Sequence, residues 1–188
     1  MSDELLYPTA EDVLAIHEDV VASDPGIEPS VRTPGAVSSA LAYVSEGYFG
    51  QVPETTHEKA AHLIRLLAAD RPFVDGNKRT ALASVATLYA MNGYSFEYDD
   101  DIRTILKRLG TDESAVDVEA IAEYYRENGI DMTAQRSETD QEYARERARL
   151  RERIRTTDSD TERREAVRRL AEIDREVHAD IYEKLTRE

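Results

Sequence analysis

Apolar residues recur at intervals of three and four along nearly the whole chain. In the segment from Ala10 to Ala22, for example, Val13, Ile16 and Val20 fall on one side of a helix. This spacing indicates amphipathic α-helices, because a half-buried strand would alternate at every second residue. It predicts helices over residues 10–22, 34–46, 58–70, 77–92, 101–109 and 115–127. The expected fold class is therefore all-α, a helical bundle in which residues 47–54 form a short hairpin or flap.

Charge divides the chain into two parts. Residues 1–130 hold 10 basic and 23 acidic side chains, whereas residues 131–188 hold 14 basic and 16 acidic ones. The change falls near Gly129, and glycine is a residue that often ends a helix. We therefore expect an acidic globular domain over residues 1–130 and a charged helical extension over residues 131–188.

The extension is expected to form a helical hairpin or a coiled-coil arm. A continuous apolar stripe runs from Val167 to Leu185, a thinner one precedes it, and residues 156–162 interrupt the pattern. Within this break, Ser159 and Glu162 have the spacing of a capping box. A single frayed, salt-bridged helix is the alternative. The stripe needs a partner, which we expect to be the first helix of the extension, the bundle, or a second copy in a homodimer.

The composition argues against several classes of protein. The 188 residues include no cysteine, which excludes disulfides, thiolate zinc sites and cysteine nucleophiles. No apolar run reaches the roughly 18 residues that a membrane span needs, and no signal-like leader is present, so we expect a cytoplasmic protein that does not bind membranes. The net charge of −15 argues against nucleic-acid binding, and with only four lysines it favours a protein adapted to concentrated salt.

One segment, RPFVDGNKRT at residues 71–80, combines a helix start with local positive charge. Pro72 cannot continue the preceding helix, and Asp75 suits the N-cap of a helix that begins at Asn77. The first amides of such a helix have no partners within it and point outward. Together with the helix dipole, they form a site for an anion such as phosphate.

Charged side chains flank this predicted helix start. The phosphate-binding residues are expected to be Gly76, Asn77, Lys78 and Arg79, of which the last two add positive charge to an otherwise acidic domain. Asp75 is the candidate ligand for Mg²⁺, which prefers oxygen donors beside phosphates. The alternative is a well-capped helix whose basic residues only face solvent.

The same segment resembles the signature of the Fic/Doc family in its Doc (death-on-curing) branch, His-x-Phe-x-Asp-(Gly or Ala)-Asn-Lys-Arg-Thr. Residues 73–80 match this pattern throughout, and the likeness extends to residues 16–17, 34–42 and 92–94. The resemblance covers about residues 7–130 and does not include the extension. It implies an all-α bundle in which the motif loop joins two central helices, with a flap alongside.

The resemblance also implies an activity, the transfer of part of ATP onto a hydroxyl of a target protein in the presence of Mg²⁺. Fic enzymes transfer AMP, whereas the Lys-Arg ending is similar to that of Doc toxins, which phosphorylate their target and are silenced by a partner antitoxin. The family's catalytic residues fall at Arg71, Asp75 and Asn77. In the family, the position of Asp75 helps to hold the metal, that of Asn77 orients the loop and the phosphates, and those of Lys78 and Arg79 bind phosphates.

One position departs from the family pattern. The histidine that takes a proton from the target hydroxyl falls at Arg71, and arginine cannot act as a general base near neutral pH. Arg71 can still hold a phosphate, so we expect nucleotide binding to be kept and transfer to be impaired. His17 is expected to be structural, and His57, His62 and His178 are not convincing replacements.

Three functional hypotheses remain. The first is a Doc-like toxin that transfers phosphate or AMP from ATP to a protein hydroxyl. The second is a catalytically degenerate member of the fold that binds a nucleotide or a partner without turnover, and in the third the extension is the functional part. Residues 42–47 approach the self-inhibitory motif of some Fic proteins, but Ala42 lacks the required hydroxyl, so intrinsic autoinhibition is not expected.

Overall fold

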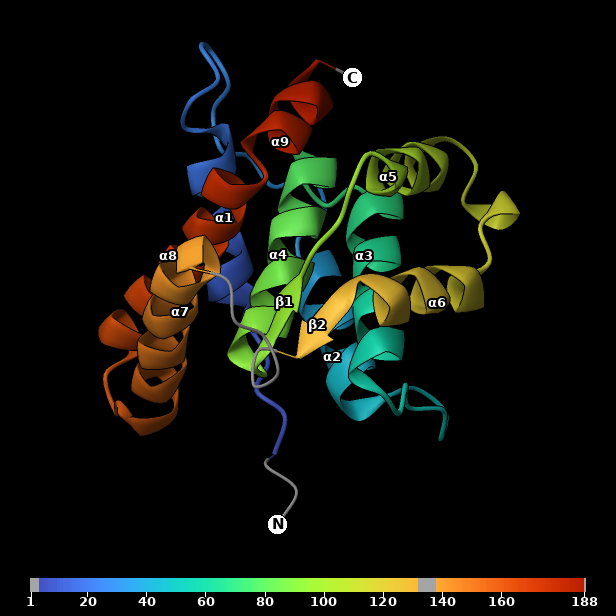
Figure 1. Ribbon diagram of the computed structural model, residues 1–188. Helices are drawn as coiled ribbons and strands as arrows, with labels where there is room; N and C mark the ends of the chain where they lie inside the picture. Colours follow the sequence, from blue (N-terminus) through green and yellow to red (C-terminus); the bar gives the residue numbers. More distant parts are fainter. Residues whose placement is uncertain (1–3, 132–137, 188) are drawn as a thin grey trace.

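The computed structural model describes residues 4–131 and 138–187, and within them the chain is almost entirely helical (Figure 1). The predicted all-α class is confirmed. In chain order the helices are α1 (Ala10–Val21), α2 (Ala36–Glu46), α3 (Thr56–Ala69), α4 (Asn77–Met91), α5 (Asp101–Thr111), the short 3-10 helix η1 (Glu113–Ala115), α6 (Val118–Asn128), α7 (Glu138–Thr156), α8 (Asp160–Val177) and α9 (Ala179–Thr186). No helix among the described residues is both long enough and apolar enough to cross a membrane.

Helix α4 is the centre of the bundle. It packs against α1 and α3 and also against α8 and α9, which come from the extension (Figure 1). Every residue of α4 except Lys78 is buried. The predicted amphipathic pattern over residues 77–92 is therefore wrong for this helix, because the extension covers the face that would otherwise meet solvent. Small residues let the neighbouring helices approach closely, namely Thr80, Ala81, Ala83, Ser84, Ala86, Thr87 and Ala90.

Two short strands lie where the sequence predicted none. Strands β1 (Tyr94–Phe96) and β2 (Gly129–Asp131) pair antiparallel, with Ser95 opposite Ile130. Three residues are too few for an alternating pattern to stand out in a sequence. The predicted end of a helix at Gly129 is confirmed, since α6 ends at Asn128 and the Gly129 amide donates to the Tyr125 carbonyl.

The short hairpin or flap predicted for residues 47–54 is a tight hairpin turn, and it does not lie beside the motif loop. Tyr48 and Gln51 exchange two backbone hydrogen bonds of 2.9 and 3.0 Å. This turn precedes α3, whereas the motif loop follows α3, and a helix of 14 residues separates the two by roughly 20 Å. The extended segment beside the motif loop is instead residues 30–33, where Val31 forms a β-bridge with Phe73.

Within its described residues, 138–187, the extension forms three helices and not two. Ser159 caps α8 as predicted, because its hydroxyl accepts a hydrogen bond from the Glu162 amide. The Glu162 carboxylate instead accepts a hydrogen bond from the Thr157 hydroxyl, so the predicted capping box is incomplete. His178 lies between α8 and α9 and separates them.

The apolar stripe of the extension packs on the bundle and on α7, which are two of the three partners expected for it. Val167, Leu170, Ile181 and Leu185 are buried, and Val177 is exposed. The homodimer and the domain boundary at residue 130 stay predictions.

Candidate functional site

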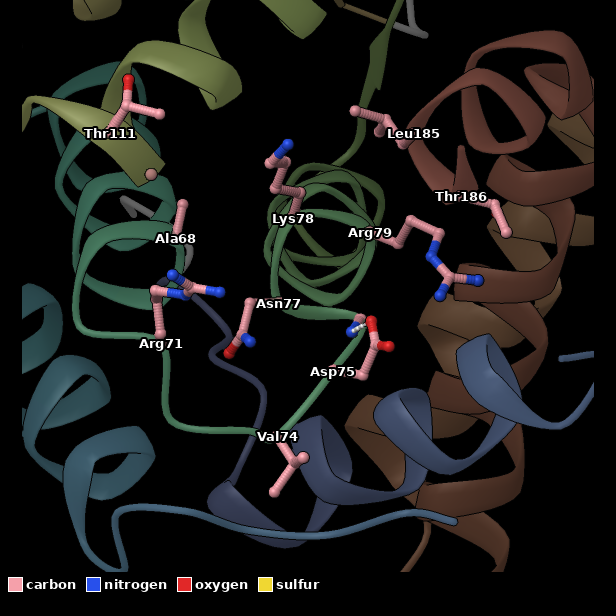
Figure 2. Close-up of a pocket in the computed structure, with 12 residues that line it drawn as sticks. Ala68, Arg71, Val74, Asp75, Asn77, Lys78, Arg79, Thr111, Leu185 and Thr186 are labelled. Carbon is pink, nitrogen blue, oxygen red and sulfur yellow. Dashed lines mark hydrogen bonds between the residues drawn. The ribbon is translucent and has the colours of Figure 1, made fainter. Parts of the chain in front are cut away.

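A pocket of about 430 Å³ lies at the N-terminal end of α4 (Figure 2). Three parts of the chain form it: the motif loop between α3 and α4, the C-terminal end of α5, and the C-terminal end of α9. Its lining residues are Ala68, Arg71, Val74, Asp75, Gly76, Asn77, Lys78, Arg79, Gly110, Thr111, Leu185 and Thr186. All six predicted site residues, from Arg71 to Arg79, are therefore brought together in one pocket.

The motif loop is held from outside by the extended segment at residues 30–33. The Arg32 amide donates to the Pro72 carbonyl at 2.7 Å, and the Val74 amide donates to the Ser30 carbonyl at 3.0 Å. Arg71 begins the loop with a φ of 49°, in the left-handed region that L-residues rarely adopt. These backbone bonds fix the loop despite that unfavourable conformation.

Asn77 holds the loop from inside. Its Oδ1 accepts from the Phe73 amide and its Nδ2 donates to the Phe73 carbonyl, both at 2.9 Å. The ring of Phe73 is fully buried and stacks on His17 with a centroid distance of 3.8 Å. The side chain of Asn77 is thus used by the loop itself. Its expected part in orienting phosphates stays a prediction.

The N-cap of α4 is Gly76 and not Asp75, which corrects the prediction by one residue. Gly76 has a φ of 70°, and an added Cβ would lie 2.9 Å from Cγ1 of Val21, so both its conformation and its surroundings favour glycine. The Asp75 carboxylate accepts a hydrogen bond from the amide of the next residue, Gly76, at 2.5 Å. The Gly76 amide is therefore already used, and an anion would meet the amides that begin with Asn77.

The three cations of the pocket differ in what they contact. Arg79 is buried, pairs with Asp24 at 2.5 Å and donates to the Val20 carbonyl at 3.2 Å. Among the described residues, neither Arg71 nor Lys78 has an ion-pair partner. In Figure 2 the side chains of Arg71 and Lys78 extend from the left and the centre of the pocket, while Arg79 points to the opposite side of α4, toward Thr186. Two of the predicted phosphate contacts thus carry charge that is not neutralised within the described protein.

Asp75, the predicted ligand for Mg²⁺, is the one carboxylate among the described residues that line the pocket. Its Oδ1 is engaged by the Gly76 amide, and its Oδ2 is the candidate ligand. In the described part of the chain, no group of three or more histidine and carboxylate side chains is arranged to hold a metal. Mg²⁺ commonly binds through one or two carboxylates together with substrate phosphates, so a single carboxylate beside a phosphate site fits this ion.

None of the described lining residues is a histidine. His17 lies behind the loop, with Nδ1 3.1 Å from the Thr80 hydroxyl oxygen. Burial and the nearby Arg79 lower the pKa of His17 to about 4, against a smaller opposing effect of Asp75. His57 contacts Tyr89 and His62 packs on Tyr43, and burial lowers the pKa of both. His17, His57 and His62 thus lie outside the set of described residues that line the pocket.

Sequence reasoning missed the residues that the distant helices contribute. Gly110 and Thr111 come from the end of α5, and Leu185 and Thr186 come from α9. The apolar spacing around Leu185 predicted that this residue would pack against something. It gave no indication that α9 ends beside the motif loop, because that depends on how the extension folds back onto the bundle.

Comparisons with known proteins match the two parts of the chain separately. Residues 7–89 match the Fic/DOC family, and residues 126–188 match a family described as "Putative halobacterial antitoxin to Fic". A relative is Toxin Doc of Mycolicibacterium smegmatis (strain ATCC 700084 / mc(2)155), which is 36% identical over 78 residues. The aligned region is 41% of this chain and 60% of the toxin, so the chain spans less than two thirds of the relative's length. The resemblance to the Fic/Doc family is confirmed, and the assignment of Arg71 to the motif histidine stays a prediction.

The buried His17 should make the fold less stable in mild acid. Its pKa is about 4 in the folded protein and near 6.5 in the unfolded chain, so between these values the unfolded state binds a proton that the folded state excludes. Stability should therefore fall as the pH is lowered through this window, by up to about 1.4 kcal/mol per pH unit from this residue. Thermal unfolding of wild type and His17→Gln against pH measures the effect. The variant should show a shallower decline, and parallel curves below pH 6.5 would contradict this origin.

Proposed function

We propose that the pocket binds the phosphates of ATP together with Mg²⁺, and the match of residues 7–89 to the Fic/DOC family supports this proposal. The observation that carries the proposal is the pair of unneutralised cations, Arg71 and Lys78, beside the first amides of α4. A surface with a net charge of −15 repels anions in general, so a local concentration of positive charge at a helix start is what a phosphate group needs. Lys78 is also the single residue of α4 that is not buried.

Each loop residue has a separate part in this proposal. Lys78 and Arg71 hold the phosphate oxygens, and Arg71 can do so through two parallel hydrogen bonds. Asn77 keeps the loop in place through its two bonds to Phe73. Asp75 would hold Mg²⁺, which neutralises phosphate charge when it is bound. Arg79 fixes the start of α4 to the end of α1 through Asp24 and Val20 and borders the pocket, so its direct contact with phosphate is the less supported part of the prediction.

The proposed reaction is transfer of a phosphoryl group or AMP to a hydroxyl of a target protein. The hydroxyl oxygen would attack the γ-phosphorus of ATP, with ADP as the leaving group, or the α-phosphorus, with pyrophosphate as the leaving group. In both cases the proton of the hydroxyl must pass to a base. Arg71 stands where that base is expected, and a guanidinium has no lone pair that can accept the proton. This position favours the second candidate function, a nucleotide-binding protein with little or no turnover. Lysine is scarce and acidic residues exceed basic ones, which supports the proposal that the protein works in concentrated salt under either function.

Charge reversal at the pocket tests the binding site. We expect Lys78→Glu to weaken ATP binding in the presence of Mg²⁺ at least about tenfold, because a favourable contact to phosphate becomes a repulsive one. Arg71→Glu should act in the same direction. Lys107→Glu is the matched control, since Lys107 is an exposed lysine of α5 that does not line the pocket. Isothermal titration of the folded variants gives the affinities. Equal affinity for wild type and Lys78→Glu would show that the site is misassigned.

Restoring a base at residue 71 tests the reaction. We predict that the wild-type chain transfers label weakly or not at all and that Arg71→His raises transfer by about 100-fold, the lower part of what general-base catalysis contributes. Histidine has an unperturbed pKa near 6.5 and tolerates the left-handed backbone at this position better than most residues. The measurement is transfer from α- and γ-labelled ATP to proteins of a cell lysate.

The control for this substitution is Arg71→Gln, which removes the guanidinium without supplying a base. If Arg71→Gln gained as much activity as Arg71→His, the arginine would be only an obstruction. Wild type as active as Arg71→His would place the base elsewhere and remove the case for a degenerate enzyme.

A further inference from the structure

The basic side chains of the acidic part of the chain, described over residues 4–131, differ in whether a carboxylate neutralises them. Several form ion pairs, namely Arg65 with Glu113, Arg79 with Asp24, Arg103 with Asp100 and Arg126 with Glu119. Lys59 is buried and donates to the Val44 carbonyl at 2.7 Å. The others have no ion-pair partner among the described residues, and they are Arg32, Arg71, Lys78, Lys107 and Arg108.

Helix α5 places two of these unpaired cations beside the pocket. It buries Ile102 and Leu106 on its inner side, while Lys107 and Arg108 are exposed on its outer side. Thr111, which lines the pocket, follows one helical turn later. Residues three and four apart on a helix are neighbours, with Cβ atoms about 5–6 Å apart. Lys107 and Arg108 therefore lie next to the wall that α5 contributes to the pocket.

Arg32 lies at the other end of the pocket. Its Nη2 donates to the carbonyl of Val74 at 3.4 Å, and Val74 is a lining residue. In Figure 2, Val74 and Thr111 lie at opposite ends of the pocket, and Arg71 and Lys78 lie between them. The unpaired cations from the extended segment, the motif loop, α4 and α5 thus form a row across the pocket.

The carboxylates that follow α5 do not neutralise this row. Asp112 accepts a hydrogen bond from the Ser114 hydroxyl at 2.7 Å, and Glu113 pairs with Arg65. A row of unpaired positive charge has the opposite sign to a chain with a net charge of −15, so it attracts a negatively charged partner locally. ATP would supply that charge only in the middle of the row, because Arg32, Lys107 and Arg108 do not line the pocket.

We propose that the cation row, defined as Arg32, Arg71, Lys78, Lys107 and Arg108, docks an acidic segment of the target protein. The acceptor hydroxyl would then lie over the pocket with aspartate or glutamate on both sides of it. This inference rests on the proposed transfer function and adds the chemical class of its protein substrate.

The size of the row sets the spacing of the acidic residues. The last turn of α5 spans about 6 Å along its axis, and an extended segment advances about 3.3 Å per residue. Carboxylates about two to four residues from the acceptor hydroxyl would therefore reach the ends of the row. A nucleic acid is the less favoured occupant, because the net charge of −15 repels a continuous chain of phosphates.

The experiment uses the full chain and fluorescent synthetic peptides. One peptide carries a threonine with glutamates two to four residues away on both sides, and its matched partner carries glutamines in their place. Binding is followed by fluorescence anisotropy with ATP and Mg²⁺ present, at about 0.15 M salt, where the Debye length of about 8 Å leaves contacts between neighbouring charges measurable. We expect the glutamate peptide to bind at least about tenfold more tightly than the glutamine peptide.

Charge reversal on α5 tests whether the row is responsible. Lys107→Glu combined with Arg108→Glu should weaken the glutamate peptide at least about fivefold, because attractive contacts become repulsive. Isothermal titration should show an unchanged ATP affinity, since neither residue lines the pocket. The matched control is Arg145→Glu combined with Arg149→Glu, which makes the same change of net charge at exposed residues of α7. We expect it to leave the affinity for the peptide unchanged.

Peptides with glutamates on one side of the threonine test the two ends of the row separately. Arg32→Glu should weaken one of these peptides, and the α5 double variant should weaken the other. Equal binding of the glutamate and glutamine peptides, or equal losses in the α5 and α7 variants, would overturn the docking role.

Three further outcomes separate this inference from the alternatives. A loss of ATP affinity in the α5 variant as large as its loss of peptide affinity would overturn docking, because these cations would then serve the nucleotide. Tighter binding of a single-stranded oligonucleotide than of the glutamate peptide would assign the row to nucleic acid instead. Unchanged ATP affinity in Lys78→Glu would overturn the phosphate site, and that result is obtained independently of the peptide affinities.

Discussion

The structure depends on the complete burial of α4. A helix rich in alanine, serine and threonine can be enclosed on all sides, and here α1 and α3 cover one part of it while α8 and α9 cover another. The C-terminal segment is therefore part of the core and not an arm attached to it. This burial also determines which part of α4 can meet a ligand. Only the start of the helix is accessible, and Lys78 is its one accessible side chain. The free amides of the helix and the charge of Lys78 are thereby directed into the same small pocket.

Some residues of the motif shape the loop, and others remain available to bind a ligand. Asn77, Phe73 and Gly76 are occupied in shaping the loop, through two amide bonds, a buried ring and a left-handed backbone. Arg79 fixes α4 to the end of α1. Only Arg71 and Lys78 keep unneutralised charge for a ligand among the described cations of the pocket. Under the proposed function, an arginine in place of the family's histidine at residue 71 would remove a proton acceptor and supply a phosphate contact, so that binding would persist while turnover is impaired.

The sequence predicted local features well and long-range placement poorly. Helical spacing located α1 to α6 within a few residues, and the motif identified every loop residue that lines the pocket except Val74. It located the short hairpin within residues 47–54 but not the segment beside the motif loop, because whether residues 30–33 or 47–54 lie there depends on tertiary pairing. It could not show that Arg79 meets Asp24, which lies 55 residues away. Nor could it place Leu185 at the pocket, because apolar spacing shows that a face is buried and not what covers it.

Residues of both parts of the chain line one pocket, which is proposed to bind phosphate. A titration of the uniformly ¹⁵N-labelled full chain with ATP and Mg²⁺, followed by amide chemical shifts, tests this most directly, since the protein has a mass of only 21.2 kDa. The largest shifts should occur together in residues 76–78 at the start of α4 and in residues 185–186 at the end of α9. Shifts that leave both groups unchanged, or that gather at the exposed turn around Phe49, would contradict it.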